Sequence, residues 1–102
     1  MINTEITSLA DTYRLMQSDD YKERFLAEYY QTKIRYNKLH KMIIKYEADT
    51  LDFEPNCSVE LLINQASAMG EYLHILEVRA IIEDVDLYRI CYPVSYKQYL
   101  QY

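Results

Sequence analysis

The acidic side chains of this sequence gather in three clusters, and paired carboxylates are common groups for general acid–base catalysis. The clusters are Asp19 with Asp20, Asp49 with Asp52 and Glu54, and Glu83 with Asp84 and Asp86. Each cluster falls at a predicted helix end, where capping and solvation explain it and where no pKa-shifting cleft is expected. The sequence also contains no glycine-rich phosphate loop, nucleophile elbow or Cys/His dyad. We therefore expect no catalytic residue and a protein that is not an enzyme.

The side chains that could act as soft metal ligands are His40, His74, Cys57 and Cys91. In the helix pairing derived below, the two histidines are about eight residues apart along the hairpin, or roughly 12 Å at helical rise. One ion with bonds of about 2 Å cannot join them. Cys57 falls in a predicted turn, away from both histidines. We expect no metal site, no cofactor and two free thiols.

Basic residues concentrate in one stretch of the chain, at Lys33, Arg35, Lys38, Lys41 and Lys45. One interpretation is structural, because cations suit the C-terminal half of a helix and keep its outer face in solvent. The other interpretation is a ligand site in which Tyr30 stacks on a base while Lys33, Arg35 and Lys38 meet phosphates at a subunit junction. Both remain open at the level of sequence.

The elements that would carry these residues are helices, since one glycine and two prolines in 102 residues are too few for a fold of many turns. The predicted fold class is all-α, a long antiparallel helix hairpin resembling a coiled coil. We place a short N-terminal helix at 3–17, the hairpin helices at 21–48 and 58–84, and a Tyr-rich tail with a short helix at 85–102, all in one domain. The first helix is predicted to present Ile6, Leu9, Tyr13 and Met16 on one face, with Asn3 or Thr4 as its cap.

Each long helix has a heptad pattern of apolar residues. The first carries Phe25, Tyr29, Thr32, Tyr36, Leu39, Ile43 and Tyr46, and the second carries Val59, Leu62, Ala66, Met69, Leu73, Leu76 and Ala80. Such spacing is typical of two helices that pack at a shallow angle, and the short connector makes them antiparallel. Facing residues should have numbers that add up to about 106, so that Tyr36 faces Met69 and Gly70. Asp20 and its neighbours, and Asn56 or Ser58, are the expected caps.

Further apolar residues lie off this seam, and they predict a homo-oligomer or a protein partner. The expected interface residues are Leu26, Ile34, Tyr72 and Ile75, with Tyr92, Tyr96 and Tyr99 of the tail. The tail either packs back on its own hairpin or reaches a partner, and both uses need the same aromatic surface.

The formal net charge of −5 disfavours duplex nucleic acid as a partner, since phosphate contacts need a basic surface. No run of residues approaches the roughly 20 apolar residues of a membrane span. The first residues lack the basic and apolar regions of a secretion signal. These features together indicate no membrane partner and a protein of a reducing cytoplasm.

The segment DYKERFLAEYYQTKIRYNKLHKMIIKYEADTLDFEPNC, with the later ELL, QA, AMGEYLHILEVRA and IE, resembles a family of small helical-hairpin proteins. The family is encoded by bacteriophages and prophages of gut bacteria, crAss-like phages among them. The resemblance covers about residues 20–85. The family often has Leu where this chain has Thr32, Gly where it has Asp49, and Pro where it has Ser58. The resemblance rests on Asp20, Tyr21, Arg24, Glu28, Tyr29, Arg35, Lys38, Leu39, residues 50–53, Leu61, Leu62, Gln65, Met69, Tyr72, Leu76, Arg79 and Glu83.

The resemblance implies a phage protein, and the first hypothesis is an accessory protein that counters host defence by binding without turnover. By analogy with small helical phage proteins that trap immune signals between subunits, its ligand would be a cyclic nucleotide or a cyclic ADP-ribose-type molecule. A second hypothesis is a protein–protein inhibitor of a host defence complex, as anti-CRISPR proteins are. A third is a phage structural or assembly factor. All three place the protein in the cytoplasm of the infected bacterium.

Overall fold

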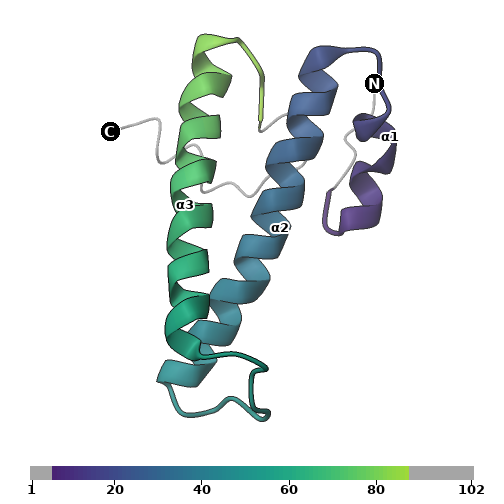
Figure 1. The fold of residues 1–102 in the computed structure, drawn as a ribbon. Helices are drawn as coiled ribbons and strands as arrows, with labels where there is room; N and C mark the ends of the chain where they lie inside the picture. The colour runs from purple at the N-terminus through teal and green to yellow at the C-terminus, as the bar shows by residue number, and fades with distance from the viewer. Residues whose placement is uncertain (1–5, 88–102) are drawn as a thin grey trace.

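Two long antiparallel helices form the body of the protein (Figure 1). The computed structural model describes residues 6–87, in which η1 (Leu9–Thr12) and α1 (Tyr13–Met16) precede α2 (Tyr21–Glu47) and α3 (Val59–Ile82). Figure 1 shows α1 beside α2, on the side away from α3. The all-α hairpin is confirmed for this part of the chain. The predicted short helix of the tail and its interface residues Tyr92, Tyr96 and Tyr99 lie outside the described residues.

The N-terminal segment differs from the prediction in both its start and its buried face. Its first helical turn begins at Leu9, because the Asp11 carboxylate accepts hydrogen bonds from the backbone N–H groups of Thr7 (2.9 Å) and Ser8 (3.0 Å) and fixes the chain there. That 3₁₀ turn has three residues per turn, so Thr12 and Leu15 become the buried pair. Of the stripe predicted from α-helical spacing, Ile6 packs against the core, whereas Leu9, Tyr13 and Met16 are exposed.

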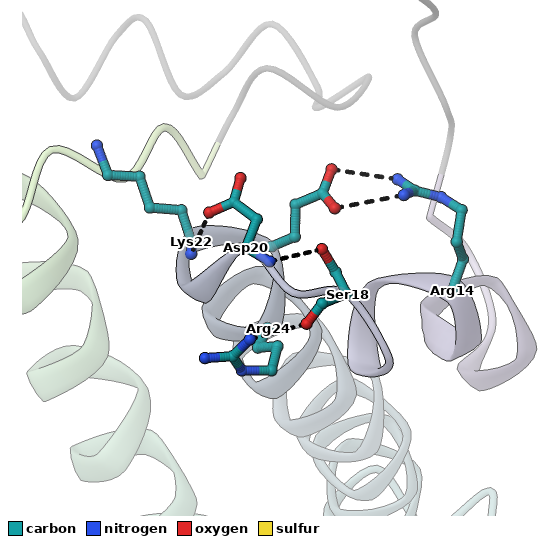
Figure 2. A network of polar contacts seen from close by, with 6 residues as sticks. Arg14, Ser18, Asp20, Lys22 and Arg24 are labelled. Carbon is teal, nitrogen blue, oxygen red and sulfur yellow. Dashed lines mark hydrogen bonds and ion pairs between the residues drawn. The ribbon is translucent and has the colours of Figure 1, made fainter.

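A set of polar contacts fixes the corner between α1 and α2 (Figure 2). Asp20 is the N-cap of α2, as predicted, and its side chain accepts from the backbone N–H of Lys22 at 2.9 Å. Ser18 accepts from the backbone N–H of Asp20 at 3.0 Å, and Arg24 donates to the Ser18 carbonyl at 2.8 Å. Arg14 and Glu23 add an ion pair at 3.3 Å. The direction of α2 relative to α1 is therefore held from both sides of the turn.

The predicted register of the hairpin is confirmed by two contacts. The Tyr29 hydroxyl donates to Glu77 at 2.7 Å, and these residue numbers add up to 106. Tyr36 lies against Gly70, where an added Cβ would be 3.7 Å from Tyr36 Cε1. Ser58 caps α3 and accepts from the Leu61 backbone N–H at 3.2 Å.

Both long helices end in the same backbone turn, with an aspartate at positive φ. Asp49 has φ 62° and Asp84 has φ 60°, and the Thr50 N–H bonds the Lys45 carbonyl just as the Val85 N–H bonds the Ala80 carbonyl, both at 2.8 Å. This is the Schellman arrangement, in which glycine is the residue of lowest strain. The second such turn reverses the chain after α3, and Figure 1 shows the reversed segment beside α2 and α3.

The reversed segment completes a core that the heptads alone do not predict. Val85 and Leu87 join Phe25, Tyr29, Leu73, Leu76 and Ala80 in one buried cluster. Leu26 and Tyr30 belong to the same cluster, at 1% and 4% exposure. The expectation that these two side chains stay on the surface is therefore corrected. Tyr30 also donates its hydroxyl to the Leu87 carbonyl, which ties the reversed segment to α2.

Three tyrosines tie the two helices together by donating to a glutamate of the opposite helix: Tyr21 to Glu83, Tyr29 to Glu77 and Tyr72 to Glu28. At the first of these ties, Arg79 donates to Glu83 at 2.8 Å and lies 5.0 Å from the centre of the Phe25 ring. The hydrogen bonds from Arg79 and then from Tyr21 hold the pKa of Glu83 below its ordinary value of 4.5. Part of the tyrosine content thus serves the hairpin itself.

Candidate functional site

The second half of α2 is a cationic stretch in an acidic chain. No aspartate or glutamate occurs from Tyr29 to Tyr46, while Lys33, Arg35, Lys38, Lys41 and Lys45 all lie there. The whole protein has a formal net charge of −5, so this stretch must carry a local field opposite in sign to the overall charge. It is the part of the described surface most suited to an anion.

Four of these residues share one side of the helix. Arg35, Lys38, Lys41 and Lys45 follow each other at spacings of three, three and four residues, and all four are exposed. We call them the basic strip. With 3.6 residues per turn, Lys38, Lys41 and Lys45 fall within about 60° of each other and on the side of α2 turned away from the seam. Figure 1 shows α1 beside the first half of α2 only, so no helix among residues 6–87 covers the basic strip.

Lys33 is separated from the rest by helix geometry. It lies about 160° around α2 from Arg35, although only two residues separate them. A small ligand bound to one copy can meet Arg35 with Lys38, or Lys33, but not all three. The structure therefore brings together two of the three predicted cations and leaves Lys33 for a different contact.

The basic strip makes no ion pair within residues 6–87, where the three salt bridges are Arg14–Glu23, Lys22–Asp84 and Arg79–Glu83. Lysines at spacings of three and four, such as Lys38, Lys41 and Lys45, repel each other by about 0.2–0.5 kcal/mol per pair. A helix face of this kind gains from a bound anion, because the anion relieves the repulsion and accepts charge-assisted hydrogen bonds.

Tyr30 does not form part of this surface. Its ring packs edge-on against Tyr29, with ring centroids 5.2 Å apart, and its hydroxyl donates a hydrogen bond to the Leu87 carbonyl. A nucleobase could stack on it only if residues 83–87 moved away. Tyr30 is therefore a core residue, which packs α2 against the rest of the buried cluster.

The predicted interface residues are divided between core and surface. Leu26 is in the core and Ile34 is half-buried, whereas Tyr72 and Ile75 are exposed on α3 at 39% and 54%. Within residues 6–87, no group of three His, Cys, Asp or Glu side chains is placed to hold a metal ion. Cys57 is exposed with a free thiol, and Cys91 lies outside the described residues. No helix of the described part is long and apolar enough to cross a membrane.

Lys41 and Lys45 share the face of Lys38, although the site predicted from sequence consists of Tyr30, Lys33, Arg35 and Lys38 without them. Their spacing from Lys38, three and then seven residues, was the available signal that they share its face. The same reasoning placed Tyr30 in the site because the reversed segment that buries it could not be foreseen.

A helix hairpin whose cationic face is exposed and makes no ion pair within the described residues defines a class, a small binding protein for anionic ligands. Residues 19–82 match the Sequestin family, and since this is more than half of the chain, the protein belongs to that family. Sequestin proteins are phage proteins that sequester nucleotide immune signals as anti-defence sponges, without catalysis. The hypothesis of anti-defence binding without turnover is thereby confirmed. No curated protein and no solved structure matches the chain.

The matched residues coincide with α2, the connecting turn and α3. The N-terminal helix lies before the match, and the tail lies after it. The family relationship thus concerns the hairpin, which is the part of the molecule that carries the basic strip.

Proposed function

We propose that the basic strip of α2 holds the phosphates of the sequestered signal, a cyclic nucleotide or a cyclic ADP-ribose-type molecule. The observation that carries this proposal is the run of exposed cations that make no ion pair with residues 6–87, in the family-matched hairpin of a net acidic chain. A signal of this kind presents phosphate charges, and charge-assisted hydrogen bonds to phosphate each contribute about 1.5–3 kcal/mol. Two or three such contacts supply most of a micromolar affinity.

The base of the ligand needs a flat apolar surface as well. Tyr46 is half exposed in the last turn of α2, about 100° around the helix from Lys45, so its ring lies at the edge of the strip that is nearer the seam. We assign the stacking role to this tyrosine in place of Tyr30. Stacking of a base on an aromatic side chain contributes about 1–3 kcal/mol.

We further propose that the protein acts as a homo-oligomer, because Lys33 can join Arg35 and Lys38 around one ligand only when a second copy supplies one of them. Exposed Tyr72 and Ile75, half-buried Ile34, and Tyr92, Tyr96 and Tyr99 of the tail are the candidates for contacts between copies. Sequestration requires protein in excess of the signal and tight binding, and no chemical step.

The origin and place of action follow from the same resemblance. We propose that the gene belongs to a crAss-like phage or a prophage of gut bacteria, and that the protein works in the cytoplasm of the infected cell, where such signals circulate. Fractionation of infected cells tests the second statement, and recovery of the protein in the envelope fraction would contradict it.

The direct test is calorimetric titration of the purified protein with a panel of cyclic dinucleotides, cyclic trinucleotides and cyclic ADP-ribose variants. One member of the panel should bind and be recovered unchanged after the protein is denatured by heat. Binding should weaken as salt rises, because the contacts are to exposed charges. Recovery of a cleaved product would contradict sequestration.

The site is tested by the double variant Lys38→Gln, Lys41→Gln. Loss of two phosphate contacts should weaken binding at least 100-fold at unchanged helicity. The matched control is Lys22→Gln on the same helix, because its 3.9 Å ion pair with the exposed Asp84 contributes little. Equal affinities of the two variants for the ligand would show that the ligand does not bind at the basic strip. Binding of no panel member, with capture of a host defence complex instead, would favour the protein–protein inhibitor.

A further inference from the structure

The flank of α3 carries a second heptad line outside the seam that faces α2. Leu61, Ala68, Tyr72, Ile75 and Ile82 recur along it, and all five are exposed. At 100° per residue this line lies about 110° around α3 from the seam that faces α2. The spacings are seven, four, three and seven residues, and Gln65 and Arg79 fill the two gaps of seven. Such a line, on a face that no helix of residues 6–87 covers, is the pattern of a helix that packs against another helix. We call these five residues the outer stripe.

The outer stripe extends over most of α3, from Leu61 to Ile82, which is roughly 32 Å at helical rise. The four large residues of the stripe are exposed at fractions from 39% for Tyr72 to 75% for Ile82. Together with Ala68 and the neighbouring Val78, they leave about 500 Å² of surface in contact with solvent. Two copies packed through this surface would bury about 1,000 Å², the lower bound for a specific interface.

The order of residues along the stripe selects the direction of packing. Its polar members are Gln65 and Arg79, one near each end. In an antiparallel pair, Gln65 of one copy meets Arg79 of the other, and small Ala68 meets large Ile75. In a parallel pair in register, Ala68 would meet Ala68 and Ile75 would meet Ile75, which would leave a gap at one level and crowd the other. The charge of Arg79 does not select a direction, because it is paired with Glu83 of its own chain.

Tyr72 occupies the centre of this arrangement, where an antiparallel two-fold axis would cross α3. Its ring is held in place from its own chain, because its hydroxyl donates to Glu28 of α2. Fixing the ring in advance lowers the entropy lost on association. Aromatic rings at the centre of an interface contribute more than residues at its rim.

We propose that the outer stripe of α3 is the surface through which two copies of this chain form an antiparallel two-fold dimer. The proposal rests on the homo-oligomer proposed above and names its surface and direction. Arg35 lies two turns after Glu28 on the same flank of α2, so one end of the basic strip borders this dimer interface. A ligand bound at Arg35 therefore lies close to the second copy.

The first experiment is sedimentation equilibrium of the full chain and of Ile75→Asp, without ligand. The wild type is expected as a dimer and Ile75→Asp as a monomer of unchanged helicity. The matched control is Ile81→Asp on the same helix, since Ile81 is 82% exposed and lies about 120° from Ile75. A monomeric wild type, or an equal effect of both substitutions, would overturn the proposal.

The direction is tested by cysteine crosslinking in a Cys57→Ser, Cys91→Ser background. Ala68→Cys mixed with Ile75→Cys should form a disulfide-linked pair under mild oxidation, and Ala68→Cys alone should not. Rapid crosslinking of Ala68→Cys alone would indicate parallel helices and refute the antiparallel arrangement. Calorimetric titration of the wild type tests the sponge function independently of these experiments. Failure to bind any signal would reject the sponge function but would not contradict the dimer.

Discussion

Replacing Tyr30 by phenylalanine separates a structural role from a ligand-binding role at a residue that sequence alone assigned to the ligand. The ring of Tyr30 is 4% exposed, and its hydroxyl donates to the carbonyl of Leu87. Phenylalanine keeps the ring and its edge-on contact with Tyr29, so the substitution removes only the hydroxyl. The reversed segment after α3 then loses its tie to α2.

The cost follows from the burial of the acceptor. The Leu87 residue is 3% exposed, and an unsatisfied buried acceptor costs about 1–3 kcal/mol. Because the substitution removes one hydrogen bond and leaves the packing of the ring intact, we expect the lower half of that range, about 1–2 kcal/mol. For a chain of this size, this lowers the melting temperature by roughly 5–15 °C.

Urea denaturation followed by circular dichroism at 222 nm gives the free energy of unfolding for the wild type and Tyr30→Phe. The control is Tyr13→Phe, whose side chain is 61% exposed on α1 and should change stability by less than about 0.5 kcal/mol. Signal binding by Tyr30→Phe, measured well below its melting temperature, should equal that of the wild type. Normal stability together with lost binding would show that Tyr30 meets the ligand and that our reading of its burial is mistaken.

The remaining predictions concern the hairpin and its ends. Leu76→Ala should cost about 2–5 kcal/mol in urea denaturation, since the side chain is fully buried, and a cost below about 1 kcal/mol would contradict the packing described. Gly70→Ala should stabilise by about 0.5–1 kcal/mol in the same assay, because its Cβ meets Tyr36 at an ordinary 3.7 Å, and destabilisation would reveal a tighter helix contact. Asp49→Gly should raise stability by about 0.5–1 kcal/mol by removing strain at φ 62°, seen as a higher melting temperature, whereas a lower one would mean that the Asp49 side chain stabilises the turn. The pKa of Glu83 is lowered in the folded protein, so its contribution is present above pH 4.5 and is lost as pH falls below that value. The urea midpoint of the wild type should therefore drop below about pH 4.5 more steeply than that of Glu83→Gln, and parallel profiles would refute this linkage.

The hairpin could be predicted from sequence because its information is local and periodic. Heptad spacing specifies which residues face the partner helix, and a short connector specifies antiparallel packing, so the Tyr36–Gly70 and Tyr29–Glu77 pairs follow from arithmetic. The caps at Asp20 and Ser58 were equally readable, because each is a polar residue directly before an apolar periodic run.

The errors have physical causes of two kinds. At the N-terminus, a short 3₁₀ turn changed the angular period, and the only sequence sign of its start was Ser8 with Asp11 three residues later. At the other end, the chain reversal at Asp84 brings Val85 and Leu87 onto α2, which buries Leu26 and Tyr30. That contact joins segments far apart in sequence, and no periodic pattern records it.

The two halves of α2 serve opposed requirements, and this division explains how the hairpin remains folded with a repulsive face. The first half carries the buried core and the three Tyr–Glu ties, along with the ion pairs near Glu23 and Glu83. The second half has the unpaired basic strip and a seam that ends at a half-exposed Tyr46. Because the stability is concentrated at the first half, the second half can tolerate clustered positive charge before a ligand arrives. In the proposed complex, the binding of an anion would remove a repulsion that the free protein contains, so that part of the affinity would come from relief within α2 rather than from the contacts alone.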